Sequence, residues 1–326
     1  MTRFTAILML LFVFSVALAE GGLIIDEWRV PYENSRPRDP FVDSSGKVWF
    51  CGQAGRYIAW FDPEQEKFGK FDLADGAGPH NLIIDDKDRI WFAANTRPYI
   101  GRLDGTTGEV VKFPMPVGLA KDPHTLVFDG TGHIWFTAQW ANAVGRLDMN
   151  TGEVNVIEVP EPDSRPYGIK VDDRGRPWVV LFGTHYLATI DPVTLELETI
   201  ELPRFEARPR RLEILQGVIW YGDYAAGFLG RYDPILQQFS EWPLPGGERA
   251  RPYGMASDGR SNLFVAEGGS PNRVVRFDVS TKTFAEITPA PNSRGSIRHM
   301  YYHAPSGDIW FGEDSNFISR IKGAKP

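Results

Sequence analysis

Two histidines stand at matching positions of neighbouring repeats in this sequence. Each follows a proline and precedes a short apolar run, as Pro79-His80 and Pro123-His124. Asp122 lies two residues before His124, where its carboxylate could orient an imidazole or bind a metal. Two imidazoles and a carboxylate can supply a general base, a general acid and an orienting group near neutral pH. The alternative is that Pro-His only opens a strand and that the imidazole caps a loop.

The same position can be found in every repeat, because a Trp-aromatic dipeptide or its equivalent recurs at intervals of 42–46 residues. The copies begin at Trp49, Trp91, Trp135, Trp178, Trp220, Phe264 and Trp310. Counting back eleven residues, and reading the fifth repeat from its Arg-Pro-Arg context, gives Arg38, His80, His124, Tyr167, Arg210, Tyr253 and, in the last repeat, Arg298 or His299. None of these residues is apolar. This set favours a binding site for a small molecule that is anionic or rich in carbonyl groups.

A second set of polar residues lies three or four positions after each dipeptide. It consists of Asn95, Gln139, Asp223, Glu267 and the pair Glu313-Asp314. The acids cluster in the last three repeats, opposite Arg210, Arg298 and Arg38. Acids and arginines would either neutralise each other as ion pairs or form a clamp for a divalent cation or a substrate, with Glu267 and Glu313 as substrate contacts.

The elements that position these residues follow from one repeat, residues 79–116. Four short apolar segments alternate with Gly, Asp and Asn turns, which is typical of one antiparallel four-stranded blade. A repeat of this length predicts an all-β seven-bladed β-propeller. The last repeat has only three strands, and residues 24–31 resemble an unpaired fourth strand. We therefore expect the N-terminal strand to complete the last blade, which removes an exposed sheet edge.

The ends and the composition of the chain limit its function. Residues 1–19 have the pattern of a secretory signal peptide, and the predicted propeller domain covers residues 20–326. The alternative is an uncleaved N-terminal anchor. With signal cleavage, we expect a secreted or periplasmic monomer without a membrane span. The net charge of −7 and the absence of a basic run argue against nucleic acid as a partner, and Cys51 is the only cysteine.

At these residues the chain resembles the streptogramin B lyase (virginiamycin B lyase) family of seven-bladed propellers. The resemblance covers essentially the whole of the predicted propeller domain and rests on residues 90–92, 145–147 and 165–169. Members of that family open a cyclic depsipeptide by elimination, with a magnesium ion on the ester side and a histidine as general base. The resemblance therefore implies a carbon–oxygen lyase with a divalent cation, Mg²⁺ first, as cofactor.

The resemblance also implies roles for individual residues. His124 would be the general base, His80 the acid or orienting group, and Asp122 with Gln139 the metal ligands. Asp122 stands where the family has Glu, and Gln139 stands where it has an acid. Two alternatives come from other classes. One is a non-catalytic periplasmic sensor or binding propeller, and the other is a lactone hydrolase resembling gluconolactonase.

Overall fold

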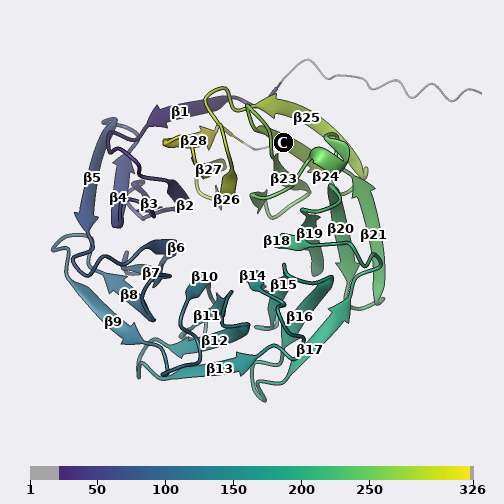
Figure 1. Cartoon of the computed structure of the whole chain (residues 1–326). Helices are drawn as coiled ribbons and strands as arrows, with labels where there is room; N and C mark the ends of the chain where they lie inside the picture. The colour runs from purple at the N-terminus through teal and green to yellow at the C-terminus, as the bar shows by residue number, and fades with distance from the viewer. Residues whose placement is uncertain (1–21, 324–326) are drawn as a thin grey trace, which may run out of the picture.

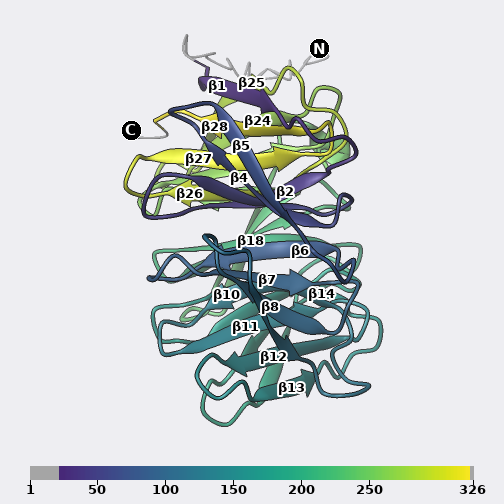
Figure 2. The same ribbon diagram turned by 90° about the vertical axis from the view of Figure 1, so that its left-hand side faces the viewer.

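The computed structural model describes residues 22–323, so the predicted signal peptide lies outside the described residues. Seven four-stranded antiparallel sheets stand in a ring around a central channel, with the first strand of each blade innermost (Figures 1 and 2). The predicted all-β seven-bladed propeller is confirmed. In the described part of the chain, no helix has the length and apolar character needed to cross a membrane.

The strands have the following bounds. Blades one and two comprise β2 (Pro37–Val42), β3 (Val48–Gly52), β4 (Tyr57–Asp62), β5 (Lys67–Asp72), β6 (Pro79–Ile84), β7 (Ile90–Ala94), β8 (Tyr99–Leu103) and β9 (Val110–Pro114). Blades three and four comprise β10 (Pro123–Phe128), β11 (His133–Ala138), β12 (Ala143–Asp148), β13 (Val154–Glu158), β14 (Pro166–Val171), β15 (Pro177–Leu181), β16 (Tyr186–Ile190) and β17 (Leu197–Glu201). Blades five and six comprise β18 (Pro209–Leu215), β19 (Val218–Asp223), β20 (Phe228–Asp233), β21 (Gln238–Pro243), the short 3₁₀ helix η1 (Gly247–Arg249), β22 (Met255–Ser257), β23 (Asn262–Glu267), β24 (Arg273–Asp278) and β25 (Thr283–Pro289). Blade seven comprises β26 (Ile297–His303), β27 (Asp308–Glu313), β28 (Phe317–Ile321) and, from the other end of the chain, β1 (Ile25–Arg29).

The ring closes as the sequence predicts. β1 pairs antiparallel with β28, with Ile25 opposite Ile321 and Arg29 opposite Phe317. The outer strand of the last blade therefore comes from the N-terminal end of the described chain. Closure leaves no blade with a missing strand along the ring.

The Trp-aromatic dipeptide explains why each repeat forms the same blade. Trp91 is fully buried and belongs to the cluster that blade two forms with blade three, and its indole N–H donates to Asp85 over 2.8 Å. The same Asp85 carboxylate accepts the backbone N–H groups that tighten the turn before β7. Phe92, the next residue, covers Gly101 on β8, where any side chain would collide with the ring. One dipeptide thus fixes both the turn and the packing of the next strand.

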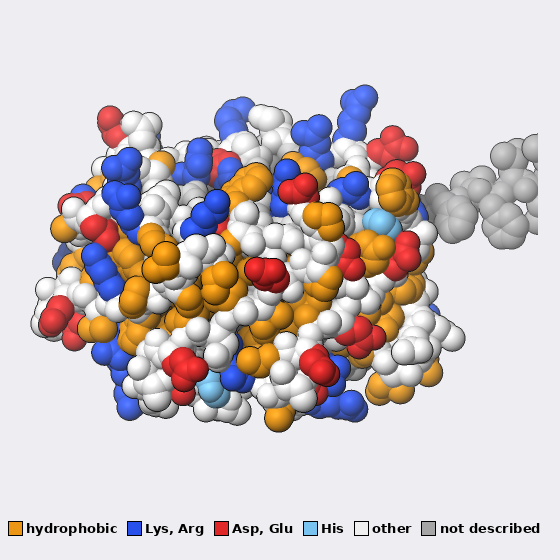
Figure 3. Space-filling view, turned by 60° about the horizontal axis from the view of Figure 1, so that its bottom comes forward, with side chains coloured by type: hydrophobic (Ala, Val, Ile, Leu, Met, Phe, Trp, Pro, Cys, Tyr) orange, Lys and Arg blue, Asp and Glu red, His pale blue; other side chains and the backbone are white. Residues whose placement is uncertain are grey.

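The outer wall of the ring carries basic, acidic and hydrophobic side chains mixed together in the view of Figure 3. Exposed large hydrophobic residues such as Val193 and Ile235 occur at turns between outer strands. Neither sign of charge dominates the face seen in Figure 3. The distinctive chemistry of the molecule lies in the central channel instead.

Candidate functional site

A β-bulge places two side chains over the channel in nearly every blade. The register of the first strand shifts by a residue near its start in six blades, for example between Pro123 and Leu126 in β10. A bulge bends the strand and turns consecutive side chains toward the same edge. The first residue of each pair faces the channel end where these strands begin, and the second lies one step further in.

We name the two sets of residues by this order. The upper tier consists of Arg38, His80, His124, Tyr167, Arg210, Tyr253 and Arg298. The lower tier consists of Asp39, Asn81, Thr125, Gly168, Arg211, Gly254 and His299. The upper tier agrees with the eleven-residue count in five blades, while Arg210 was predicted from its context and Arg298 from the apolar pattern of the last repeat. The alternative residue, His299, belongs to the lower tier, because the bulge in β26 presents both.

The two predicted catalytic histidines lie together. The rings of His80 and His124 have centroids 3.6 Å apart, and His80 Nδ1 lies 3.2 Å from the His124 carbonyl oxygen. Burial, followed by the charge of nearby arginines, lowers the pKa of both imidazoles well below the usual value, so both are neutral at pH 7.

His124 is enclosed by its neighbours. Its ring lies 4.2 Å from that of Tyr167, and its Nδ1 lies 2.9 Å from the Thr125 hydroxyl. Its Nε2 is buried without a hydrogen-bond partner, and the whole residue is only 1% exposed. In this arrangement a ligand in solvent does not reach the nitrogen that would act as the base.

The predicted metal ligand Asp122 already accepts hydrogen bonds from the backbone. One Asp122 oxygen accepts the backbone N–H of Trp140 over 2.6 Å, and the other accepts that of Ala141 over 3.0 Å. Burial raises the pKa of Asp122, and no contact joins its carboxylate to an imidazole in the described chain. Gln139 is half-buried nearby. Over residues 22–323, no three His, Cys, Asp or Glu side chains come together as a metal site. This donor set therefore fits a divalent cation poorly, and Asp122 acts as a brace for the loop after β11.

Arg210 is the most unusual cation in the channel. Its guanidinium carbon lies 3.6 Å from the ring centre of Tyr253, 4.5 Å from that of Tyr224, 4.6 Å from that of Phe182 and 5.2 Å from that of Tyr167. No carboxylate of the described residues lies within ion-pair distance of it. An enclosed cation with aromatic neighbours and no acid is a ready partner for an anion.

Tyr253 shares this positive environment. Its hydroxyl forms a hydrogen bond with that of Tyr167 and accepts a long one, 3.4 Å, from Arg298. Burial alone would raise the pKa of Tyr253. Arg210, Arg38 and Arg298 outweigh burial and lower it to about 8. Tyr253 is therefore the upper-tier group closest to ionisation at neutral pH.

The other upper-tier arginines are paired. Arg298 makes a two-pronged contact with Asp314, at 2.8 and 2.7 Å, as the ion-pair alternative predicts. Arg38 is 2% exposed and donates to Asp39 over 3.0 Å and to Gln53 over 3.1 Å. Arg210 is thus the member left for an external anion.

A cavity of about 490 Å³ opens beside Tyr253, between blades five, six and seven. Tyr224, Arg249, Arg251 and Asn272 contribute to its wall. The volume is within the usual range of small-molecule sites, roughly 300–1,000 Å³. A ligand seated here would contact Tyr253 directly, whereas Arg210 lies against the Tyr253 ring and outside the cavity wall.

The predicted acidic contacts behave differently from each other. Glu267 lines this cavity, but its oxygens accept the Gly246 N–H over 2.9 Å and an ion pair from Arg273. Glu313 is buried within blade seven, where it accepts from Ser315 over 3.1 Å and from Ser319, and burial raises its pKa to about 7. Both acids serve their own blade, and Glu313 lies outside the cavity wall.

Several residues of the channel were not predicted from the sequence. Asp39, Asn81, Thr125 and Arg211 form a buried network in the lower tier, and Phe182 and Tyr224 complete the box around Arg210. Asn81 donates to Asp39 over 2.9 Å, and Arg211 donates to Thr125 over 3.2 Å. The doubled arginine at 210 and 211 is the one sequence signal that could have revealed the second tier.

Comparisons with known proteins agree with this architecture. The sequence profile of the virginiamycin B lyase family matches residues 16–277. No match was found among curated proteins. A streptogramin B lyase structure superimposes with a TM-score of 0.82 at 22% identity, covering 92% of this chain and 97% of that one.

Two further structures extend the comparison. A catalytically inactive virginiamycin B lyase from Staphylococcus aureus with quinupristin gives a TM-score of 0.83 at 20% identity, over 92% of this chain and 99% of that one. The extracellular domain of a putative one component system from B. thetaiotaomicron gives 0.68 at 18% identity, over 90% of this chain and 40% of that one. At these identities the structures establish the fold. The profile match covers most of the sequence, and the chain belongs to the virginiamycin B lyase family.

Proposed function

We propose that the chain binds a small anionic or carbonyl-rich molecule in the cavity beside Tyr253 and cleaves a carbon–oxygen bond in it by elimination. The observation that carries this proposal is Arg210, a cation boxed by four aromatic rings and without an acidic partner in the described chain. A ligand carboxylate or carbonyl oxygen would complete the charge of the site.

The chemistry follows from the neighbours of Arg210. Because the nearby arginines lower the pKa of Tyr253 to about 8, its phenolate is accessible near neutral pH. The phenolate oxygen takes the proton from the carbon next to the carbonyl group. That electron pair forms a carbon–carbon double bond as the oxygen on the following carbon departs with its bonding pair. The proton then passes from Tyr253 to the departing oxygen, and the positive charge of Arg210, next to the Tyr253 ring, favours the negative charge that builds on the carbonyl oxygen.

This assignment differs from the one that the family resemblance implies. In the assignment implied by the resemblance, His124 is the base, His80 assists it, and Asp122 with Gln139 binds a divalent cation. Tyr253 is almost as buried as His124, at 3% against 1% exposed, but Tyr253 lines the cavity and His124 lines neither cavity of the channel. This difference and the occupied oxygens of Asp122 favour Tyr253 as the base. No step proposed here passes through a metal ion.

The second candidate is a non-catalytic binding or sensor propeller. It is favoured by the burial of both histidines and by the likeness to an extracellular domain of a putative one component system. The same likeness supports an exported location for the propeller. A lactone hydrolase remains the third alternative, and it differs from a lyase in its product.

The test compares Tyr253→Phe with His124→Phe, using a panel of β-oxygenated esters and carboxylates. Elimination creates a double bond conjugated to the carbonyl group, which is measured by its ultraviolet absorbance, whereas hydrolysis creates none. We expect Tyr253→Phe to lower turnover by about 10²- to 10⁴-fold, and His124→Phe to lower it far less.

Three results would reject parts of this proposal. Loss of turnover only in His124→Phe would return the base to the histidine. Loss of wild-type turnover on treatment with a chelator would restore the divalent cation. Binding of ligands by calorimetry without any new absorbance would favour the sensor.

A further inference from the structure

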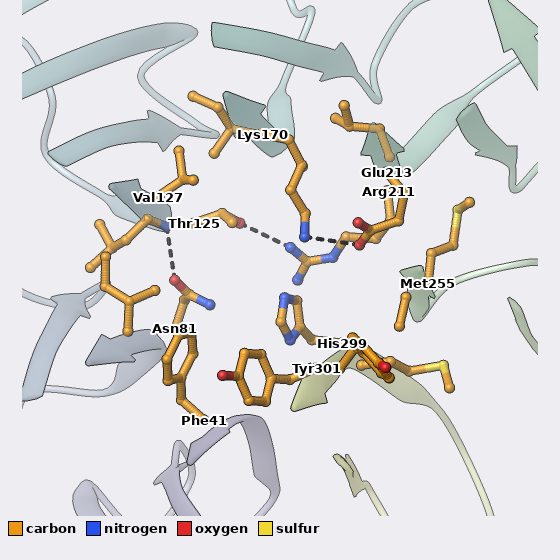
Figure 4. A pocket seen from close by; sticks show the side chains of 18 of the residues that line it. Phe41, Asn81, Thr125, Val127, Lys170, Arg211, Glu213, Met255, His299 and Tyr301 are labelled. Atoms are coloured by element: carbon orange, nitrogen blue, oxygen red, sulfur yellow. Dashed lines mark hydrogen bonds and ion pairs between the residues drawn. The ribbon is translucent and has the colours of Figure 1, made fainter. Parts of the chain in front are cut away.

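The channel also opens at its other end, into a second cavity of about 330 Å³ (Figure 4). It is formed by the later residues of the first strands, below the lower tier. Its wall is largely apolar and includes Phe41, Leu82, Ile169, Met255 and Tyr301. The buried tiers lie between this cavity and the one beside Tyr253. The two cavities are therefore separate sites.

The floor of the second cavity carries positive charge. Arg211 is 4% exposed and points into the cavity among the labelled side chains of Figure 4. It donates to the Thr125 hydroxyl and to the Arg298 carbonyl oxygen, each over 3.2 Å. Its third nitrogen is buried without a hydrogen-bond partner and lies 3.5 Å from Asp39.

The charges of this floor do not cancel. Asp39 already pairs with Arg38 at 3.0 Å, so one carboxylate serves two buried guanidinium groups. Lys170 and Glu213 form their own ion pair at 2.9 Å on the cavity wall. One positive charge therefore remains without a counter-ion among these groups. A buried charge of this kind is costly unless it is paired.

His299 is a second residue at this cavity with a buried nitrogen that has no hydrogen-bond partner. Its Nδ1 is buried without a partner, and burial lowers the pKa of the imidazole to about 3. The ring is therefore neutral at pH 7 and can donate a hydrogen bond from one nitrogen. Arg211 and His299 face the same space in Figure 4, where Tyr301 also lies.

We propose that this lower cavity binds a small monocarboxylate with an apolar body. The carboxylate would lie at the inner end of the cavity against Arg211 and His299, whose unpartnered nitrogens are buried there, and the body would lie against the apolar wall. A single negative charge matches the single uncompensated positive charge. A cavity of this size, at the lower end of the usual range for ligand sites, suits a short aliphatic or aromatic acid.

Calorimetric titration of the full chain with octanoate tests the proposal. Octylammonium has the same chain with the opposite charge, and acetate has the same charge without the chain. We expect octanoate to bind and the two controls to bind at least tenfold more weakly. Equal binding of octanoate and octylammonium would overturn the proposal.

Adjacent arginines provide the matched pair of variants. Arg211→Met removes the charge of the lower cavity, and Arg210→Met removes the neighbouring charge that faces the other end of the channel. We expect about a 10- to 100-fold loss of octanoate affinity in Arg211→Met and no change in Arg210→Met. Loss of octanoate affinity in Arg210→Met but not in Arg211→Met would place octanoate in the cavity beside Tyr253 and overturn the proposal.

Because Arg211 belongs to a buried network, Arg211→Met could disturb the fold. A second variant that leaves this network intact is therefore needed. The Lys170 side chain is 35% exposed, and Lys170→Glu places a second carboxylate beside Glu213 at the cavity. We expect octanoate affinity to fall about tenfold in this variant. Unchanged affinity in a folded Lys170→Glu protein would contradict the proposed position of the carboxylate. This test does not depend on any turnover at Tyr253.

Discussion

The two ends of the channel are built from neighbouring residues and have opposite designs. At the upper end, Arg210 sits among four aromatic rings, and Tyr253 is drawn toward ionisation. At the lower end, Arg211 is held by polar partners at the inner end of an apolar cavity. The upper end therefore offers a group that can exchange a proton, and the lower end offers a pairing site in an apolar wall. A bulge in six of the seven blades is enough to give a single channel two kinds of chemistry.

Asp39 is the group that the two ends share. It pairs with Arg38 of the upper tier, lies 3.5 Å from Arg211 of the lower tier, and accepts from Asn81. Asp39→Asn keeps the shape of the side chain and removes its charge. We expect it to lower the free energy of unfolding by about 3–5 kcal/mol, because it leaves buried arginines without a counter-ion. Urea denaturation measures the change, and a loss under 1 kcal/mol would mean that the tiers do not depend on this carboxylate.

The same residue predicts a pH dependence. Arg38 leads the interactions that outweigh burial and hold the pKa of Asp39 well below its usual range. The unfolded chain therefore binds this proton more readily, with a pKa of about 3.9. The stabilisation is present above that pH and is lost as the pH falls further. Asp39→Asn should lack this part of the acid sensitivity, so the difference in stability between wild type and variant should narrow steadily as the pH falls below about 4.

Tyr253 tests the upper end alone. The ultraviolet difference spectrum between wild type and Tyr253→Phe should reveal a tyrosine that ionises near pH 8. Arg210→Met should move that ionisation back toward the ordinary value of about 10. Arg211→Met should move it less, because Arg211 has the weakest effect of the four arginines on this hydroxyl. Equal shifts in the two variants would erase the electrostatic distinction between the ends.

The smallest change in unfolding free energy is expected for an ion pair that is partly exposed to solvent. The side chains of Arg298 and Asp314 are 21% and 22% exposed. Asp314→Asn should cost about 1 kcal/mol in the unfolding free energy, less than Asp39→Asn, since a partly exposed ion pair keeps part of its hydration. The contrast with Asp39→Asn is the measurement of interest. A comparable loss in both variants would show that depth in the channel does not control the strength of these pairs.

The fold and the upper tier could be predicted because both follow from a repeat. The dipeptide spacing indicates the blades, and an eleven-residue count from it finds five upper-tier residues, with Arg210 found from its context and Arg298 from the apolar pattern. The missing fourth strand of the last repeat indicates the ring closure with β1.

Depth and side-chain direction could not be predicted in this way. The count gives one residue per blade, whereas the bulge presents two, so Asp39, Asn81 and Arg211 were missed. A count also cannot show that His124 is covered by the rings of His80 and Tyr167. Glu313 lies at the end of β27 as expected, but its side chain turns into its own blade toward Ser315 and Ser319.

The pairing of β1 with β28 has a consequence for how the chain could be rearranged. The Lys322 N–H donates to the Ile24 carbonyl oxygen over 2.9 Å, so the two ends of the described chain meet in one blade. A short linker could join them, and new ends could then be cut in an exposed outer turn such as the one at Val193. Such a circular permutant would keep every blade and both channel mouths. The fold would then not depend on which of the seven blades comes first in the chain.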